Sequence, residues 1–234
     1  MRWLVAGGAV CSAGGLMAYA VRGRSSTLFA PSVYRGARDR RSIALTFDDG
    51  PSEGTYQLLE ILNRLETRAT FFLCGMNVER LPGIARSVAA AGHEIGNHSY
   101  SHPSLYMRSP RFIDRELGQA QGAIHSATGR TPALFRAPFG ARWFGLAEAQ
   151  RRWNLLGVMW TVIGLDWKLA ADRIARRVLA GAKNGAIICL HDGRRVERNP
   201  DIGATLEAVT RLIPALRSRG FHFETVSQLL CPTN

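Results

Sequence analysis

Two adjacent carboxylates and a pair of histidines are the residues best suited to chemistry in this chain. Asp48 and Asp49 directly follow the apolar run 43–47 and precede a Gly-Pro pair. His98 and His102 are four residues apart, a spacing that on a helical turn places both imidazoles on one face, where they can chelate one metal ion. One added carboxylate leaves a coordination position open, as in catalytic sites. These ligands suit Zn, and also Co, Mn, Ni or Fe.

Arg136, Asp166 and His191 each stand at or just beyond the end of another apolar run. A buried Arg beside a carboxylate would hold that carboxylate ionised and oriented. Asp166 could orient a histidine, and the neighbouring Trp167 could stack on a sugar ring. His191 is a candidate general acid. Each feature also has a plain structural interpretation, because Asp and Gly-Pro favour turns and a lone His is more often structural.

The elements that would position these residues alternate along the chain between short apolar runs and helical patterns. The alternation predicts a parallel α/β barrel of about seven strands, with its chemistry at the carboxyl ends of the strands. The strand-like runs are residues 43–47, 69–74, 93–97, 133–137, 155–162, 186–191 and 221–225. The helical patterns cover residues 55–65, 82–91, 111–128, 170–182 and 205–219.

Taken together, these segments resemble the five motifs of the polysaccharide deacetylase family, also called carbohydrate esterase family four or the NodB-homology domain. The resemblance covers about residues 42–230 and keeps the order of the family's motifs. It implies a distorted (β/α) barrel that binds a divalent metal, usually Zn. It also implies an enzyme that hydrolyses N-acetyl groups of a polysaccharide.

The resemblance also implies roles for particular residues. Asp49, His98 and His102 would be the metal ligands. Asp48 would be the general base, paired with and tuned by Arg136.

The remaining implied roles concern the acid and the substrate. The backbone N–H of Phe139 would help to stabilise the oxyanion. Asp166 would orient His191, which would protonate the leaving amine. Trp167 would form a wall of the acetyl or sugar pocket.

The chain departs from the family pattern at three positions. Ile163 stands where a second Asp is frequent, and we expect this to affect packing more than catalysis. Phe139 replaces a common Tyr, which matters little if the backbone carries the role. Cys189 replaces a common Leu and predicts a slightly wider acyl pocket. Strand alternation places Cys189 on the face opposite to Leu190, although both are candidate substrate-binding residues.

The start of the chain differs from the rest in composition. An uncharged apolar run predicts that residues 1–21 are a signal peptide or an N-terminal membrane anchor, a segment that would contact a membrane. Arginines on both flanks leave its orientation undecided. Residues 22–41 resemble a linker, and residues 42–234 form the predicted catalytic domain. Either interpretation of the leader predicts an extracytoplasmic domain, whether secreted, periplasmic or membrane-anchored.

Composition limits the partners. The chain has 30 Lys and Arg against 18 Asp and Glu, a formal net charge of +12. This charge favours anionic partners such as an acidic wall polymer, and its alternative interpretation is a solvated basic surface. No nucleic-acid-binding motif is present, so we expect no nucleic acid partner. The four cysteines show no metal or disulfide spacing. We expect a monomer.

Several functions fit this pattern. The leading hypothesis is an N-deacetylase of an envelope or extracellular glycan, such as peptidoglycan N-acetylglucosamine or chitin oligomers. Within the hydrolases, an O-acetyl esterase or a deformylase of formamido sugars or small amides uses the same residues. A non-catalytic carbohydrate-binding protein is a third hypothesis, disfavoured because a binder needs neither an acid nor a base.

Overall fold

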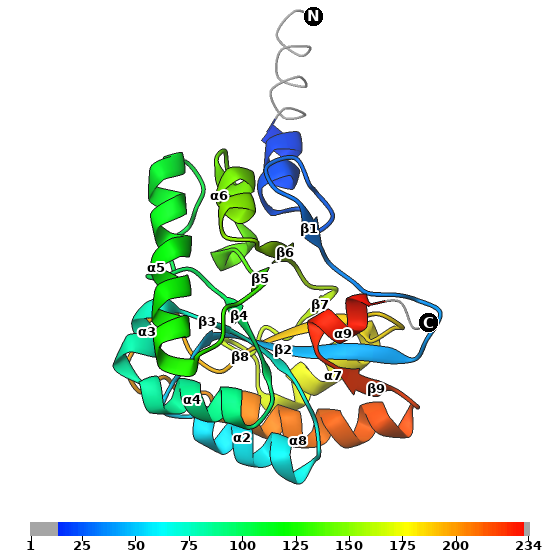
Figure 1. The fold of residues 1–234 in the computed structure, drawn as a ribbon. Coiled ribbons are helices and arrows are strands. Elements are labelled where there is room, and N and C mark those ends of the chain that lie inside the picture. The colour runs from blue at the N-terminus through cyan, green and yellow to red at the C-terminus, as the bar shows by residue number, and fades with distance from the viewer. Residues whose placement is uncertain (1–13, 232–234) are drawn as a thin grey trace, which may run out of the picture.

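A curved sheet of parallel strands forms the centre of the computed structural model, which describes residues 14–231 (Figure 1). Its nine strands are β1 Ser32–Val33, β2 Ser42–Gly50, β3 Thr70–Leu73, β4 Glu94–Asn97, β5 Leu134–Phe135, β6 Leu156–Val158, β7 Val162–Ile163, β8 Ile187–His191 and β9 His222–Glu224. Their order is β1-β6-β5-β4-β3-β2-β8-β7, with β9 also paired to β2. The strands curve into a half-barrel, which confirms the predicted fold class.

Strand β2 is the central element of the sheet. All nine of its residues are buried, as expected for a parallel strand covered on both faces. It pairs with β3 on one side and β8 on the other, in a register that sets Asp48 opposite His191 and Thr46 opposite Cys189. The ends of two segments more than 140 residues apart in sequence are therefore adjacent.

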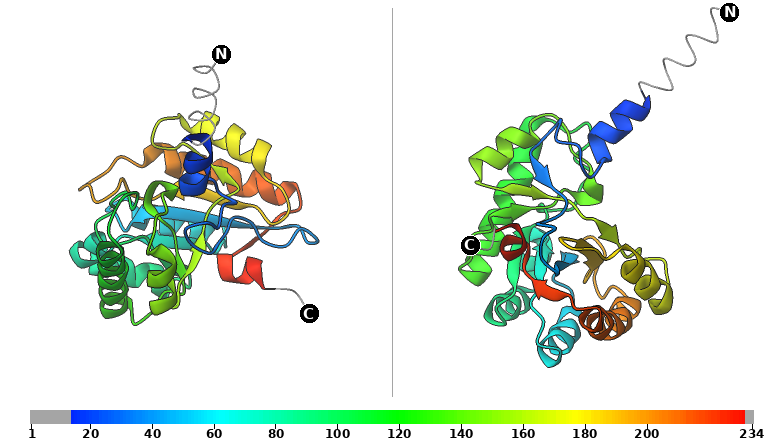
Figure 2. Two further views of the ribbon diagram at one scale, coloured as in Figure 1. Left: turned by 90° about the horizontal axis from the view of Figure 1, so that it is seen from above. Right: turned by 90° about the vertical axis from the view of Figure 1, so that its right-hand side faces the viewer.

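Helices cover the outer side of the sheet (Figures 1 and 2). They are α2 Thr55–Arg64, α3 Gly75–Arg80, α4 Pro82–Ala90, α5 Pro110–Thr128, α6 Leu146–Arg152, α7 Ala171–Gly181, α8 Gly203–Ser218 and α9 Val226–Leu230, with the 3-10 turn η1 Pro138–Gly140. The main core packs apolar residues of β2, β3 and β8 against α2, α4, α7 and α8. The five predicted helices are present. The unpredicted α3, α6 and α9 have only 5 to 7 residues, too few for a helical period to stand out.

The sheet has more strands than the seven predicted from the sequence. The apolar run 155–162 divides into β6 and β7, which pair at different places in the sheet. Strand β1 lies within residues 22–41, the segment predicted to be a linker. That prediction is wrong, because β1 pairs with β6 and the preceding Phe29 and Ala30 are buried.

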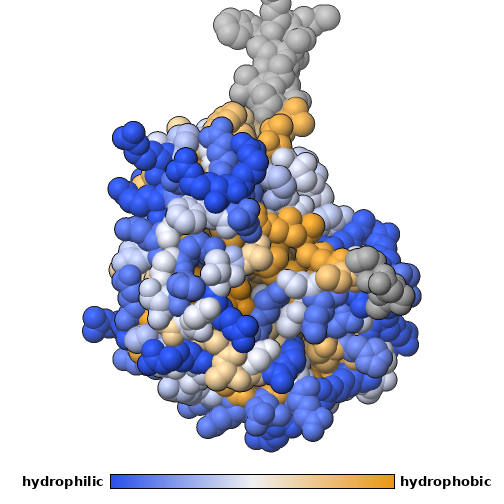
Figure 3. Space-filling model, viewed as in Figure 1, coloured by the Kyte–Doolittle hydropathy of each residue, from blue (hydrophilic) through white to orange (hydrophobic). Residues whose placement is uncertain are grey.

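The helical residues 14–22 also pack onto the domain. Ala20 and Val21 are buried against Phe29 and Ala141. Hydrophobic side chains gather where this helix meets the domain (Figure 3). Most of the predicted leader, residues 1–21, lies outside the described residues. No helix between residues 14 and 231 is long and apolar enough to cross a membrane.

Candidate active site

Most of the side chains singled out from the sequence line one cavity of about 510 Å³ at the carboxyl ends of the strands, whereas Arg136, Asp166 and Leu190 do not. This position is the one at which parallel α/β barrels place their chemistry. The lining residues are Asp48, Asp49, His98, His102, Ala137, Phe139, Trp160, Ile163, Trp167, Cys189, His191, Arg194, Arg195 and Glu197.

Asp49, His98 and His102 converge within the cavity. The Oδ1 atom of Asp49 lies 2.9 Å from Nε2 of His102 and 3.3 Å from Nε2 of His98. All three side chains are buried, and their ligand atoms lie within 4.8 Å of one another. Within the described chain, Asp49 Oδ1 has no hydrogen-bond partner. A buried unpaired carboxylate oxygen facing two imidazole nitrogens fits a divalent cation.

Further contacts hold these three groups. Burial tends to raise the pKa of Asp49, but the close imidazole groups of His102 and His98 hold this pKa well below its usual value. The other ring nitrogen of His98, Nδ1, lies 2.7 Å from the backbone oxygen of Arg136. The backbone N–H of Arg195 donates to Asp49 Oδ2 over 2.8 Å. Such contacts fix the tautomer and direction of a metal ligand.

The two histidines lie in a loop and not on a helical turn, contrary to the sequence prediction. Ser99 and His102 have positive φ angles of 65° and 57°, which interrupt any helix. Asn97 Oδ1 accepts a hydrogen bond from the Ser99 N–H, and Ser99 Oγ accepts one from the His102 N–H. The loop therefore brings the imidazoles together through its own hydrogen bonds.

Glu116 supports this loop, although nothing in the sequence indicated it. It is buried on α5, and its carboxylate accepts hydrogen bonds from the N–H of Tyr100, the N–H of Ser101 and the hydroxyl of Ser101 at 2.8–3.1 Å. A Glu in a helix is ordinarily read as a solvated residue. Only its burial and its partners identify it as part of the site's support.

Asp48 is held by the fully buried Arg136. The guanidinium Nη1 lies 2.6 Å from Asp48 Oδ1 and also donates to Thr46 Oγ1 at 2.7 Å. The rest of the guanidinium donates to the backbone oxygens of Val158 and Met159 and lies over the ring of Phe72. This cradle fixes Oδ1 of Asp48 and leaves Oδ2 for the cavity.

His191 and Asp166 form a second pair across the cavity. Nδ1 of His191 lies 2.8 Å from Oδ1 of Asp166, and Thr205 donates to the other carboxylate oxygen. Burial lowers the pKa of His191, but the hydrogen bond and charge of Asp166 outweigh it and raise the pKa to about 9. Protonation at neutral pH makes His191 a proton donor.

Two predicted substrate-binding residues, Cys189 and Leu190, lie on opposite faces of β8. Cys189 lines the cavity, with its thiol 3.4 Å from Oδ2 of Asp48. Leu190 is completely buried in the main core and does not line the cavity, so its prediction as a substrate contact is wrong. The alternation of side chains along a strand explains the difference. Ile163 pairs with Cys189 and lines the cavity, which makes it more than a packing residue.

Aromatic side chains form the outer walls. The ring of Phe139 packs edge-on to His102 with centroids 4.8 Å apart, and the ring of Trp167 packs likewise against His191 at 5.0 Å. Trp167 is 46% exposed, as a ring that meets a ligand must be. Trp160, Arg194, Arg195 and Glu197 also line the cavity and were missed from the sequence, because their positions depend on loop conformation.

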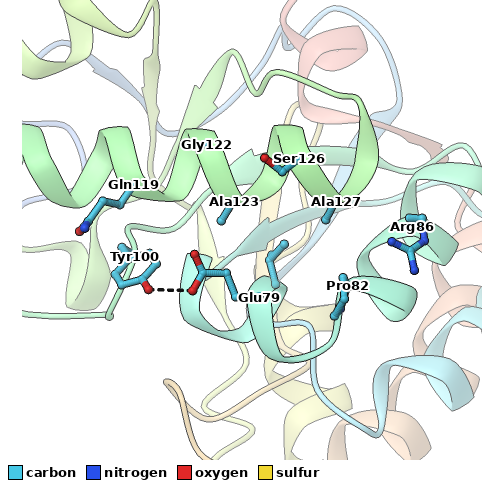
Figure 4. A pocket seen from close by; sticks show the side chains of 10 residues that line it. Glu79, Pro82, Arg86, Tyr100, Gln119, Gly122, Ala123, Ser126 and Ala127 are labelled. Atoms are coloured by element: carbon cyan, nitrogen blue, oxygen red, sulfur yellow. Dashed lines mark hydrogen bonds between the residues drawn. The ribbon is translucent and has the colours of Figure 1, made fainter.

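A second hollow of about 430 Å³ lies between α5 and the short helices α3 and α4 (Figure 4). The hydroxyl of Tyr100 donates to Glu79 across it, while Ala123 and Ala127 form part of its wall. None of its lining residues is a His, Cys or Asp. The metal-ligand geometry identifies the first cavity as the candidate active site.

A parallel half-barrel that carries a metal-ligand triad and an acid–base pair at its strand ends defines a class of metal-dependent hydrolases. The family model for polysaccharide deacetylases matches residues 35–157. The chain belongs to this family, and the resemblance seen in the sequence is confirmed.

Several known proteins that are similar to this chain are named as deacetylases of N-acetylated glycans. It is 32% identical over 203 residues to a peptidoglycan-N-acetylglucosamine deacetylase of Bacillus cereus, covering 84% of this chain and 71% of that protein. It is 36% identical over 205 residues to a chitooligosaccharide deacetylase of Bradyrhizobium, covering 84% and 94%. The crystal structure of a peptidoglycan N-acetylglucosamine deacetylase in complex with a benzamide ligand superposes with a TM-score of 0.80 at 31% identity, covering 84% and 91%.

Proposed function

We propose that this protein removes N-acetyl groups from N-acetylglucosamine residues of an envelope or extracellular glycan. The observation that carries the proposal is one cavity in which Asp49, His98 and His102 could hold a metal ion, beside the carboxylate of Asp48 and a histidine, His191, whose pKa is raised to about 9. The names of the relatives support the same substrate class. We also infer that the domain acts outside the cytosol, where such polymers lie, and the apolar leader in the sequence supports this.

Asp49, His98 and His102 would hold the metal. Two imidazoles with one carboxylate suit Zn best, and a cation bound there supplies Lewis acidity toward a carbonyl and toward water. The remaining residues of the chain then orient the substrate and move protons.

Asp48 serves as the general base. Its Oδ1 is bound by Arg136, so the proton of the attacking water passes to Oδ2, the oxygen that also meets the thiol of Cys189. A base held in one orientation reduces the entropy that the reaction must lose.

His191 serves as the general acid. Its Nδ1 is bound to Asp166, which leaves Nε2 to donate a proton to the departing amine. The backbone N–H of Phe139 would stabilise the oxyanion. Trp167 would form the wall against which the sugar stacks, and Cys189 would floor the acyl pocket.

Acetate release tests the proposal. Metal-depleted protein would be assayed on N-acetylated chitooligosaccharides and on peptidoglycan, before and after addition of one equivalent of Zn. We expect release only with metal, and almost none from Asp48→Ala protein that binds the same amount of Zn. Absence of release from every glycan by metal-loaded wild type would reject the proposal.

A further inference from the structure

Two consecutive arginines stand at the mouth of the cavity. Arg194 and Arg195 lie in the segment between β8 and α8, directly after the His191-Asp192-Gly193 turn, and both line the cavity. The mechanism proposed above uses neither guanidinium.

Arg195 is fixed on the side of the metal ligands. Its backbone adopts a left-handed conformation, φ 53°, in which its N–H reaches Asp49 Oδ2. Its guanidinium lies 5.2 Å from the ring centroid of Phe139, whose other contact is the ring of His102. Stacking on an aromatic face holds an Arg in place while leaving its in-plane donors free for a ligand.

Arg194 is fixed on the side of the acid. Its guanidinium donates to the backbone oxygens of Gly193 at 2.8 Å and Asp166 at 3.0 Å. No carboxylate in residues 14–231 lies within 4.0 Å of the guanidinium of Arg194 or Arg195. Among residues 14–231, Glu197 is the only acidic residue that lines the cavity besides Asp48 and Asp49, so the two arginines outnumber it at the mouth.

We propose that Arg194 and Arg195 form a carboxylate-binding subsite at the mouth of the cavity. This inference rests on the proposed function and deepens it. The preferred substrate is a glycan in which the acetylated sugar neighbours a free carboxylate, as in a peptidoglycan strand without its stem peptides, where every second sugar carries a free lactyl carboxylate. Guanidinium groups bind carboxylates through paired, charge-assisted hydrogen bonds, whereas a neutral chitin chain offers no such partner. The net charge of +12 also draws an anionic glycan toward the molecule.

A matched pair of glycans tests the subsite. The probes are soluble peptidoglycan strands with free lactyl carboxylates and the same strands with those carboxylates converted to amides. The measured quantity is the ratio of kcat/KM on the two glycans, for the full chain loaded with Zn. We expect wild type to prefer the carboxylate form by roughly twofold to fivefold, the range for partly exposed ion pairs.

Three variants assign the preference to residues. Arg194→Gln and Arg195→Gln should lower the ratio toward one, mainly through KM on the carboxylate glycan. Arg198→Gln is the matched control, because Arg198 is exposed on the same segment but does not line the cavity, and it should keep the wild-type ratio. Equal turnover of both glycans by wild type, or an unchanged ratio in both variants, overturns the subsite while leaving the deacetylase function intact. Absence of turnover on every glycan instead rejects the proposed function itself.

Discussion

At the scale of single residues, two neighbouring aspartates have different partners because the backbone turns between them. Asp48 lies in the buried strand β2 and meets Arg136, which directly follows β5. Asp49 has a positive φ of 74°, which directs its carboxylate to the histidines instead. A left-handed residue is uncommon outside Gly and Asn, and Asp is among those that tolerate it. The base and the metal ligand can thus be consecutive residues.

The pair formed by His191 and Asp166 predicts that a substitution of Asp166 shifts the pH profile of activity. Asp166 raises the pKa of His191 to about 9, so wild-type activity should fall as pH rises through this value. Asp166→Asn removes the charge and lowers that pKa, so the alkaline limb of kcat/KM should move to lower pH, with a loss of about 10²–10⁴ in rate. Asp172→Asn, at an exposed position on α7, should change neither. An unmoved alkaline limb in Asp166→Asn would show that another group is the acid.

The small side chain of Cys189 predicts that the cavity accepts acyl groups longer than acetyl. This side chain is smaller than a Leu and lies beside Asp48 in the cavity. Wild type should therefore turn over N-propionyl as well as N-acetyl chitooligosaccharides, and Cys189→Leu should selectively reduce the propionyl rate by about tenfold, the effect of one methylene in an apolar pocket. Equal propionyl-to-acetyl ratios in the two proteins would refute this role.

At the scale of elements, helix α5 determines the shape of the metal-ligand loop. Ser109 caps its first turn and Gly129 ends it in a left-handed conformation, so the helix is delimited at both ends. Midway along this helix, Glu116 accepts hydrogen bonds from the backbone N–H groups of residues 100 and 101, and Gln121 accepts a hydrogen bond from Asn97. The histidines are therefore held by an element that contributes no ligand.

Glu116→Gln should weaken metal binding while leaving the fold intact. The amide replaces an acceptor oxygen by a donor, so some of the three hydrogen bonds to the loop are lost. We expect Zn affinity, measured by competition with a chromogenic chelator, to fall by about 10- to 100-fold, as for other supports of metal ligands. Glu148→Gln, exposed on α6, is the matched control. Wild-type affinity in Glu116→Gln would contradict this role.

At the scale of the whole molecule, a buried arginine joins the N-terminal segment to the domain. Arg142 is 2% exposed and donates to the backbone oxygens of Val21, Gly23 and Ser26. A cation at the end of helical residues 14–22 is also favoured by the helix dipole. Residues 21–26 are therefore packed against the rest of the domain, which explains why the linker prediction failed.

Arg142→Leu should release this segment. The loss of its hydrogen bonds leaves several backbone oxygens unpaired, and we expect the free energy of unfolding in urea to fall by about 1–3 kcal/mol. Limited proteolysis should then cut near residues 22–28 at protease concentrations that spare wild type. Arg151→Leu, an exposed control on α6, should stay within about 0.5 kcal/mol of wild type. An unchanged cleavage rate in Arg142→Leu would show that other contacts hold the segment.

Local patterns in the chain were enough to predict the parallel strands, the five longer helices and the strand ends that carry Asp48, His98 and His191. Periodicity and turn residues act over a few positions, so a single stretch of sequence displays them. Strand alternation also distinguished Cys189 from Leu190, although only the buried position of Leu190 removed it from the site.

The rest of the site depends on segments that meet only in the folded chain. Glu116 reaches a loop 15 and 16 residues away, and Arg195 reaches Asp49 across 146 residues. Strand β1 exists because β6 lies beside it. Neither periodicity nor composition records such contacts, because each depends on loop conformations that long-range packing selects.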